Sequence, residues 1–556
     1  MRSRLIYAAI ATATAVPVAL AGTWGSPATN LSGEGRDAQA PQVAGGAANE
    51  ATAVWRRSDG TRFIVQASRY SGGEWSAPAD LSLAGQHAFE PHVVADTQGA
   101  VTVVWQRSDG VHDVIQARRY SGGEWGAIQN LSDTAQNAFS SQIAVDSQGI
   151  VTAIWSRSNG VHDVIQARRY SGGAWGITHN LSDGTQNAFA AQVTEGAANE
   201  ATAVWSGSDG TNRIIQTSRY SGGSWSTPVN LSAAGRDAFT PQVAEGAANE
   251  VTAVWTRDDA AGNLIVQTRH YSGGVWGATT DLSAAGRNAS DPQVAEGAAN
   301  EVTVVWYRFD GANTIVQARR SSGGVWGATT DLSAGGRDAS GPQVAQGAAN
   351  EVTAVWFRYD ASGNAIVQAS RFSGGVWGAT QDLSAAGRDA EAPQIATDPE
   401  GAVTAVWRRS NGTNTIIQAT RHRSAPTAPR DVTAAAPAAA LSVSVSPSRT
   451  RIISGGRMTA TLRTKSTGTL AASAVRSCLT LPPGLTVVRA AGARRTGRTW
   501  CFGPRNLAAG SEHAGTLTLR ATATRTVTVT ITARATARNA APAKGTPKRV
   551  RISPVR

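Results

Sequence analysis

Histidines and cysteines are the first residues to test for chemistry, because they supply most metal sites and many nucleophiles. The eight histidines are scattered without an H-x-x-x-H spacing, and the two cysteines form no C-x-x-C pair. The sequence also lacks the motifs of phosphate-binding loops, G-x-S-x-G hydrolases and calcium-binding D-x-D-x-D-G loops. It therefore predicts no metal site, no cofactor and no catalytic residue.

A pair of planar polar residues, usually behind a glycine, recurs ahead of a strand-like segment. Such groups, arranged around one face, could hydrogen-bond sugar hydroxyls or a carboxylate. The candidate ligand-binding residues are Arg36, Asp37, Arg236, Asp237, Arg287, Asn288, Arg337, Asp338, Arg388 and Asp389. The alternative is structural: each Asp or Asn caps its own turn, and each Arg pairs with the neighbouring repeat.

A second recurring group lies within strand-like segments. Each contains a tryptophan, followed two positions later by arginine in seven cases, and the next segment always carries a glutamine. These tryptophans are Trp55, Trp105, Trp155, Trp205, Trp255, Trp306, Trp356 and Trp407. We expect them to fill the core, with the indole N–H satisfied locally, rather than to form exposed sugar platforms. A second tryptophan set, mostly after Ser-Gly-Gly, should lie nearer the rim.

These residues must be positioned by a repeat of 50 or 51 residues. One unit contains four short segments rich in Val, Ile, Thr and Trp, separated by turns such as SDG and SGG. Four strands and four turns per unit are typical of a propeller blade. The fold class is therefore all-β, with an eight-bladed β-propeller over residues 22–423. The first outer strand, residues 24–32, precedes any inner strand, so we expect it to complete the last blade and close the ring.

Residues 1–21 have the two arginines, the apolar run and the A-x-A site of a secretory signal peptide. No transmembrane segment is expected after cleavage, and the protein should be secreted, either free or associated with the cell wall. An Ala/Pro-rich linker is expected at 424–440. Residues 441–556 alternate with period 2, which predicts a β-sandwich with a flexible tail. In an oxidising compartment Cys478 and Cys501 should form a disulfide.

The charge is concentrated in the C-terminal region. From residue 424 on there are 21 Lys and Arg against Asp431 and Glu512, a net charge of +19. The rest of the chain then carries −7 of the total of +12. An anionic surface is therefore the expected partner of the C-terminal domain, and no nucleic-acid partner is expected.

The repeat phrases P-x-V-A, V-x-V-W and Gly-Gly-x-Trp resemble those of sialidase-like bacterial propellers of the BNR type. That family carries Asp-box turns, Ser-x-Asp-x-Gly-x-x-Trp, and usually six blades. This chain has Arg-Tyr-Ser-Gly-Gly-x-Trp without the aspartate, as at 119–125. The resemblance implies a propeller, and the departure argues against sialidase catalysis.

The phrases at 466–470, 481–486 and 507–511 resemble the immunoglobulin-like DUF11 domain of bacterial surface proteins. That resemblance covers roughly residues 440–540 and implies a spacer or adhesion module without enzymatic chemistry. The leading hypothesis is a monomeric, secreted, non-enzymatic scaffold that binds glycans or cell-wall polymers multivalently. The alternatives are a glycoside hydrolase or polysaccharide lyase of sialidase-like fold, and a purely structural wall-associated protein.

Overall fold

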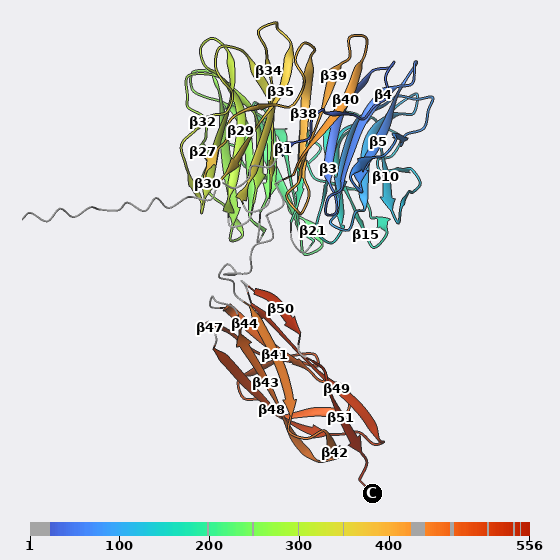
Figure 1. Cartoon of the computed structure of the whole chain (residues 1–556), viewed down its shortest axis with the longest axis vertical. Coiled ribbons are helices and arrows are strands. Elements are labelled where there is room, and N and C mark those ends of the chain that lie inside the picture. Colours follow the sequence, from blue (N-terminus) through green and yellow to red (C-terminus); the bar gives the residue numbers. More distant parts are fainter. Residues whose placement is uncertain are drawn as a thin grey trace, which may run out of the picture. The chain divides into compact units, whose positions relative to one another are not determined.

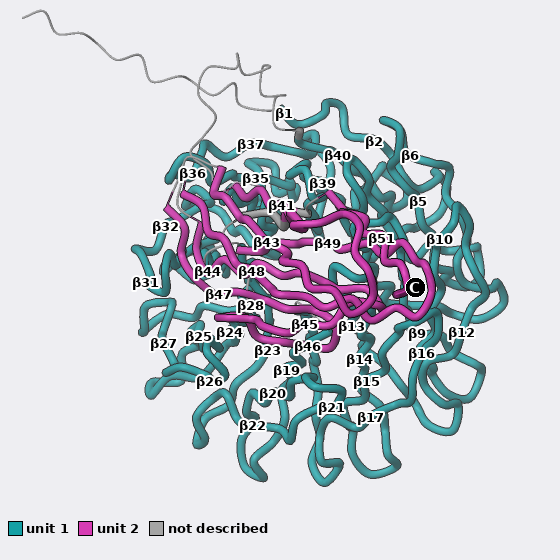
Figure 2. The backbone as a smooth tube through the Cα atoms, turned by 90° about the horizontal axis from the view of Figure 1, so that it is seen from below, with its two compact units in different colours: residues 1–427 teal, residues 428–556 magenta. Residues whose placement is uncertain are grey.

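The computed structural model describes residues 23–423, apart from 197–198, 247–248, 298–299 and 348–349, and residues 440–555, apart from 468–471, 509–510, 538–539 and 545. The chain divides into two compact units, residues 1–427 (unit 1) and 428–556 (unit 2) (Figure 2). The predicted leader lies outside the described residues, and so does the predicted linker apart from residue 440. Within the described ranges, no helix is long and apolar enough to cross a membrane.

The described part of unit 1 forms eight antiparallel five-stranded sheets, which we number 1 to 8 by their first strands (Figure 1). The first strands are β3 (Ala38–Gly45), β8 (Ala88–Ala95), β13 (Ala138–Val145), β18 (Phe189–Glu195), β23 (Ala238–Glu245), β28 (Ala289–Glu296), β33 (Ala339–Gln346) and β38 (Ala390–Thr397). The second strands are β4 (Ala51–Ser58), β9 (Val101–Ser108), β14 (Val151–Ser158), β19 (Ala201–Ser208), β24 (Val251–Asp258), β29 (Val302–Phe309), β34 (Val352–Tyr359) and β39 (Val403–Ser410). Val, Ala and Thr dominate these second strands, and the β-branched residues among them favour pleated backbone.

The third strands carry the glutamines and lie between the second strands and the short outer strands. They are β5 (Phe63–Ser71), β10 (Asp113–Ser121), β15 (Asp163–Ser171), β20 (Arg213–Ser221), β25 (Leu264–Ser272), β30 (Thr314–Ser322), β35 (Ala365–Ser373) and β40 (Thr415–Arg423). Two-residue strands complete sheets 1 to 7: β6 (Glu74–Trp75), β7 (Ala79–Asp80), β11 (Glu124–Trp125), β12 (Gln129–Asn130), β16 (Ala174–Trp175), β17 (His179–Asn180), β21 (Ser224–Trp225), β22 (Val229–Asn230), β26 (Val275–Trp276), β27 (Thr280–Asp281), β31 (Val325–Trp326), β32 (Thr330–Asp331), β36 (Val376–Trp377) and β37 (Gln381–Asp382).

The eight sheets follow one another in a closed circle. Each first strand contacts the first strand of the next sheet, and β3 contacts both β8 and β38. Sheet 8 takes its outer strands from the other end of the unit, because β1 (Thr23–Trp24) and β2 (Thr29–Asn30) pair with β40. The prediction that the N-terminal strand completes the last sheet is confirmed. This all-β arrangement of repeated antiparallel sheets fits a β-propeller.

The apolar core of unit 1 lies between neighbouring sheets. Between sheets 1 and 2, for example, Val54 and Val65 pack with Val103 and Trp105. The joint between sheets 8 and 1 is built in the same way around Trp55. Because each sheet buries its faces only against its two neighbours, the stability of the ring comes from these joints.

Unit 2 has two sheets that share one apolar core. The first contains β41 (Leu441–Pro447), β43 (Arg457–Ser466), β48 (Glu512–Ala521) and β45 (Leu485–Arg489). The second contains β42 (Arg451–Ile453), β51 (Lys548–Ser553), β49 (Val527–Ala537), β44 (Ala472–Thr480), β47 (Thr499–Leu507), β46 (Ala493–Thr496) and β50 (Ala540–Lys544).

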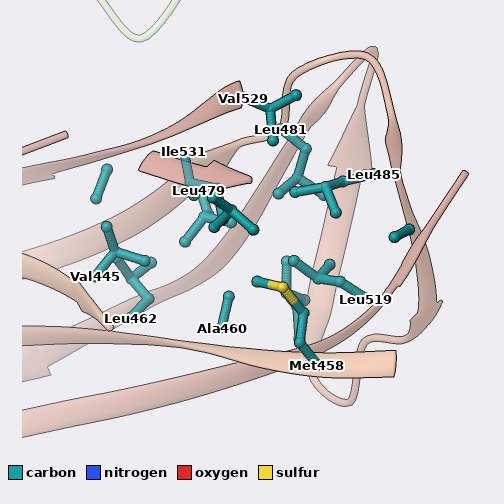
Figure 3. Close-up of a cluster of buried hydrophobic side chains, with 14 of the residues drawn as sticks. Val445, Met458, Ala460, Leu462, Leu479, Leu481, Leu485, Leu519, Val529 and Ile531 are labelled. Atoms are coloured by element: carbon teal, nitrogen blue, oxygen red, sulfur yellow. The ribbon is translucent and has the colours of Figure 1, made fainter. Parts of the chain in front are cut away.

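The core of unit 2 draws alternate residues from both sheets. Figure 3 shows Val445 and Leu462 of the first sheet beside Leu479 and Ile531 of the second. Cys478 and Cys501 lie directly opposite each other on β44 and β47 and are disulfide-bonded, as the sequence predicts.

Candidate functional site

The eight second-strand tryptophans lie in the core of unit 1. Each has an exposed fraction of 0%. Six donate the indole N–H to the glutamine on the adjacent third strand, at 3.0–3.2 Å. That glutamine in turn donates to an Asp or Asn of the outer strand, at 2.7–3.0 Å in all eight sheets. No ring face is open to a ligand, so the interpretation of these tryptophans as core residues is confirmed. The expectation of a locally satisfied N–H is not met at Trp306 and Trp407, whose N–H groups are buried without a hydrogen-bond partner.

The predicted Arg/Asp loops lie at the end of the ring where each chain segment enters its first strand. The Asp or Asn of each candidate pair accepts a hydrogen bond from the first residue of the preceding sheet's third strand, at 2.7–2.9 Å. The acceptors are Asp37, Asp237, Asn288, Asp338 and Asp389. These side chains therefore join neighbouring sheets, and their predicted ligand-binding role stays a prediction.

Three of the candidate arginines lie against the turn between the second and third strands of their own sheet. A Cβ added to Gly60 would lie 3.3 Å from the guanidinium of Arg36. Arg287 and Arg388 cover the glycines of sheets 6 and 8 in the same way. Packing of a planar guanidinium on a turn is a structural contact. It lies within the arginine's own sheet, whereas the alternative interpretation expects each Arg to pair with the neighbouring repeat, and the bond between sheets comes from the Asp or Asn instead.

An arginine follows seven of the eight core tryptophans by two residues, and most of these arginines contact the loop ahead of the first strand. Arg257, for example, donates to the carbonyl oxygens of Ala233 and Ala234 at 3.2 and 3.3 Å. Equivalent bonds reach the same loop in other sheets from Arg57, Arg308, Arg358 and Arg409. The strand-borne arginines thus hold the loop that precedes the first strand.

Grooves open between sheets at the opposite end of unit 1, where the turn after the first strand and the hairpin after the third strand lie. Here an arginine of one third strand stacks on an aromatic ring of the next sheet, 3.8–4.9 Å from its centroid. The pairs are Arg69–Tyr120, Arg119–Tyr170, Arg169–Tyr220, Arg219–Tyr271, Arg320–Phe372 and Arg421–Tyr70. Each stack forms a cation–π contact across a joint.

The groove between sheets 4 and 5 (the 4/5 groove) has a volume of about 620 Å³ and is lined by Glu200, Arg219, Asn249, Tyr271 and Trp276. Arg219 is ion-paired with Glu200 at 3.2 Å, and Tyr271 meets Trp276 edge to face at 5.4 Å. Trp276 is half-buried, unlike the core tryptophans. The groove therefore presents an aromatic surface beside a fixed guanidinium, a carboxylate and an amide.

The groove between sheets 6 and 7 (the 6/7 groove) repeats this set. It has a volume of about 750 Å³ and is lined by Glu301, Arg320, Asn350, Phe372 and Trp377. Arg320 and Glu301 are 3.2 Å apart. Two grooves with the same chemistry in the same place indicate that the arrangement belongs to the repeat.

The groove between sheets 5 and 6 (the 5/6 groove) differs from these two. Its cavity is smaller, about 290 Å³, and is lined by Thr252, His270, Asn300, Ser321 and Trp326 among others. His270 replaces the stacking arginine, and Ser321 replaces the aromatic ring that it would cover. This groove therefore lacks the cation–π contact of the others.

Two buried carboxyl groups lie at the floor of these joints. Burial raises the pKa of Glu245 to about 7, with nearby Arg219 acting against the shift. Burial raises the pKa of Glu296 to about 8, and the neighbouring Glu250 and Glu245 raise it further. Both residues end a first strand, and sequence reasoning missed them because they look like ordinary turn residues in the phrase VAEG.

The groove residues were missed for a related reason. They come from the first-strand turn and third strand of one sheet and from the hairpin of the next, so no short motif contains them. The available signal was the third-strand position held by arginine in seven repeats and by histidine at 270.

No family model and no curated protein matches the chain. Among solved structures, it is similar to a PL25 ulvan lyase, with a TM-score of 0.40 and 10% identity over 58% of this chain and 91% of that one. A Hadza microbial sialidase gives a TM-score of 0.34 and 13% identity over 67% and 74%. AofleA from Arthrobotrys oligospora gives 0.30 and 14% over 51% and 83%. At these scores the site must be judged from its own residues.

Proposed function

We propose that residues 22–423 are an eight-bladed β-propeller that binds carbohydrate in the grooves between blades, without catalysis. Residues 441–556 are proposed to be an immunoglobulin-like, DUF11-like module, and the whole chain to be secreted. The observation that carries the proposal is the recurrence of one groove chemistry in the 4/5 and 6/7 grooves.

The groove chemistry suits a polyhydroxylated ligand. A half-buried indole offers an apolar face for the C–H side of a sugar ring, and the Arg–Glu pair and the asparagine offer donors and acceptors for its hydroxyls. Volumes of about 620 and 750 Å³ fall within the usual range of ligand sites, roughly 300–1,000 Å³. Several weak sites on one ring would act together on a polymer or cell surface.

The charge of the second unit supports surface attachment. With a net charge of +19 from residue 424 on, it would be attracted to anionic wall polymers, and salt would screen that attraction. A purely structural wall protein would show the same salt-sensitive retention on cells but would bind no free glycan.

A glycan array probed with the full chain tests the function. We expect binding that falls about tenfold or more when Trp276 and Trp377 are both changed to alanine, because multivalent affinity drops steeply as sites are lost. The matched control changes Arg236 and Arg337 to alanine at the opposite end of the ring and should bind as the wild type does.

The reverse pattern, with loss only in the arginine variant, would place binding at the loops predicted from the sequence. Absence of glycan binding by the wild-type chain would overturn the proposed function. Turnover of an oligosaccharide would instead favour the glycoside hydrolase or lyase alternative. That alternative has a specific difficulty in Glu296, whose raised pKa suits a general acid but whose side chain is 0% exposed.

A further inference from the structure

The joint between sheets 5 and 6 departs from the repeat at two facing positions. His270 stands where the other sheets have Arg69, Arg119, Arg169, Arg219, Arg320, Arg371 and Arg421. Ser321 stands where the other sheets have Tyr, Phe or, in sheet 8, His422. In the neighbouring joints these two positions stack on each other. Both partners of one contact have therefore been replaced together.

At this joint a buried carboxylate has no arginine beside it. At the joint between sheets 3 and 4, Glu195 is paired with Arg169 at 3.2 Å. The corresponding Glu296 faces His270, and its side chain is 0% exposed. Neither oxygen of Glu296 has a hydrogen-bond partner, and the hydroxyl of Thr252 lies 3.0 Å from His270 Nδ1. A buried charge without a partner is costly, so the site lacks a positive group.

Three ligand atoms converge at this place. One atom each from Glu250, His270 and Glu296 lie within 4.8 Å of one another, and His270 Nδ1 is 4.0 Å from Glu296 Oε1. One oxygen of Glu250 accepts from Ser272 at 3.1 Å, and the other has no hydrogen-bond partner. Thr252 Oγ1 lies 3.0 Å from His270 Nδ1, so an ion bound at Nδ1 would replace this hydrogen bond.

We propose that Glu250, His270 and Glu296 bind one divalent transition-metal ion, with Zn²⁺ as the reference ion. Two carboxylates and an imidazole are ligands that Zn²⁺ and similar ions take, whereas Ca²⁺ and Mg²⁺ prefer oxygen alone. The ion supplies the positive charge that the missing arginine supplies elsewhere. Side-chain movements on the order of 1 Å would bring the ligand atoms to about 2.0–2.2 Å from the ion.

The three protein ligands leave at least one coordination position for a tetrahedral ion. His270 lines the cavity of the 5/6 groove, so a small ligand in that groove can reach the ion. The metal site rests on the geometry of this joint and does not depend on carbohydrate binding in the other grooves.

The test is calorimetric titration of the full chain, stripped with chelator, with Zn²⁺ alone. We expect one equivalent to bind and the melting temperature to rise. His270→Arg restores the residue found in the other sheets and is expected to fold, but should lose more affinity than the roughly 10–100-fold that removal of a supporting residue costs. Glu250→Gln changes the shape of the side chain less and should also weaken Zn²⁺ binding. Wild-type Zn²⁺ binding in both variants, or none in the wild type, would overturn the proposal.

The joint between sheets 4 and 5 allows a gain-of-function test of the metal site. Glu200, Arg219 and Glu245 occupy the same three positions between sheets 4 and 5, so Arg219→His should create a second Zn²⁺ site. Arg320→His is the matched control, because Gln346 replaces the second glutamate there. A second equivalent in the Arg219 variant alone supports the proposal, and an equal gain in both variants or in neither contradicts it.

Discussion

Two tryptophans of the same repeat, Trp255 and Trp276, show how differently one residue type is used in this molecule. Trp255 is fully buried, and its N–H is bonded to Gln267 at 3.2 Å. Trp276 lies half-buried at the rim, against Tyr271 and the 4/5 groove. Both positions recur in all eight repeats, so recurrence alone does not separate a core residue from a surface that can hold a ligand. Burial on both faces by neighbouring sheets does.

The largest expected effect is on the core side of this comparison. Trp255→Ala should lower the free energy of unfolding by about 3–5 kcal/mol, because it leaves a large cavity and an unpaired Oε1 on Gln267. Urea denaturation followed by circular dichroism measures the change. A loss below about 1 kcal/mol would mean that the ring tolerates an empty joint.

The buried carboxyl group of Glu296 should make stability depend on pH. Its pKa in the folded state, about 8, lies above its ordinary value of 4.5. The protonated carboxyl group therefore contributes to the free energy of unfolding in full below pH 4.5, and this contribution is lost as the pH rises through 8. With chelator present, Glu296→Gln should be more stable than the wild type at pH 8 by an amount on the order of 2 kcal/mol, and less so at pH 5.

Urea midpoints of both proteins at the two pH values measure this difference. Glutamine is the residue found at the equivalent position 346 in sheet 7, so the variant is expected to pack. Glu245 also titrates in this range, and for that reason the comparison is between the two proteins rather than between pH values. An identical pH dependence in both proteins would contradict a buried, unpaired carboxyl at 296.

A smaller effect is expected at the opposite end of the ring. Asp237→Ala removes the acceptor for the backbone N–H of Arg213, 2.7 Å away, and should lower the free energy of unfolding by about 1 kcal/mol. The same denaturation experiment measures it. Wild-type stability together with weaker glycan binding would instead give this carboxylate the ligand-binding role predicted from the sequence.

The smallest effect on stability is expected on the rim side of the opening comparison. Trp276→Ala should change the free energy of unfolding by less than about 1 kcal/mol, since a half-buried ring contributes only part of its area to the fold. A loss as large as that of Trp255→Ala would show that the rim tryptophans belong to the core, which would weaken the case for the grooves.

Much of the fold could be predicted from the sequence because the same pattern of residues occurs in every repeat. The period of 50 or 51 residues, the core tryptophans and the closing strand at Trp24 follow from spacing alone. The grooves could not be predicted in this way, since Arg219 and Trp276 meet only when two sheets pack side by side. His270 was visible in the sequence as a lone histidine. The roles of Glu250 and Glu296 could not be predicted, because they depend on how the joint buries these side chains beside His270.

The pairing of β1 and β2 with β40 also has a consequence for biosynthesis. Asn30 accepts a hydrogen bond from Gln418, and Thr420 donates to the carbonyl of Gly25, across nearly 400 residues of chain. Because a polypeptide is made from its N-terminus, β1 and β2 are synthesised first and cannot pair until β40 has been made. Contacts so distant in sequence are slow to form. Ring closure is therefore expected to be a late event that follows completion of the repeats, and until then sheet 8 has an unpaired edge.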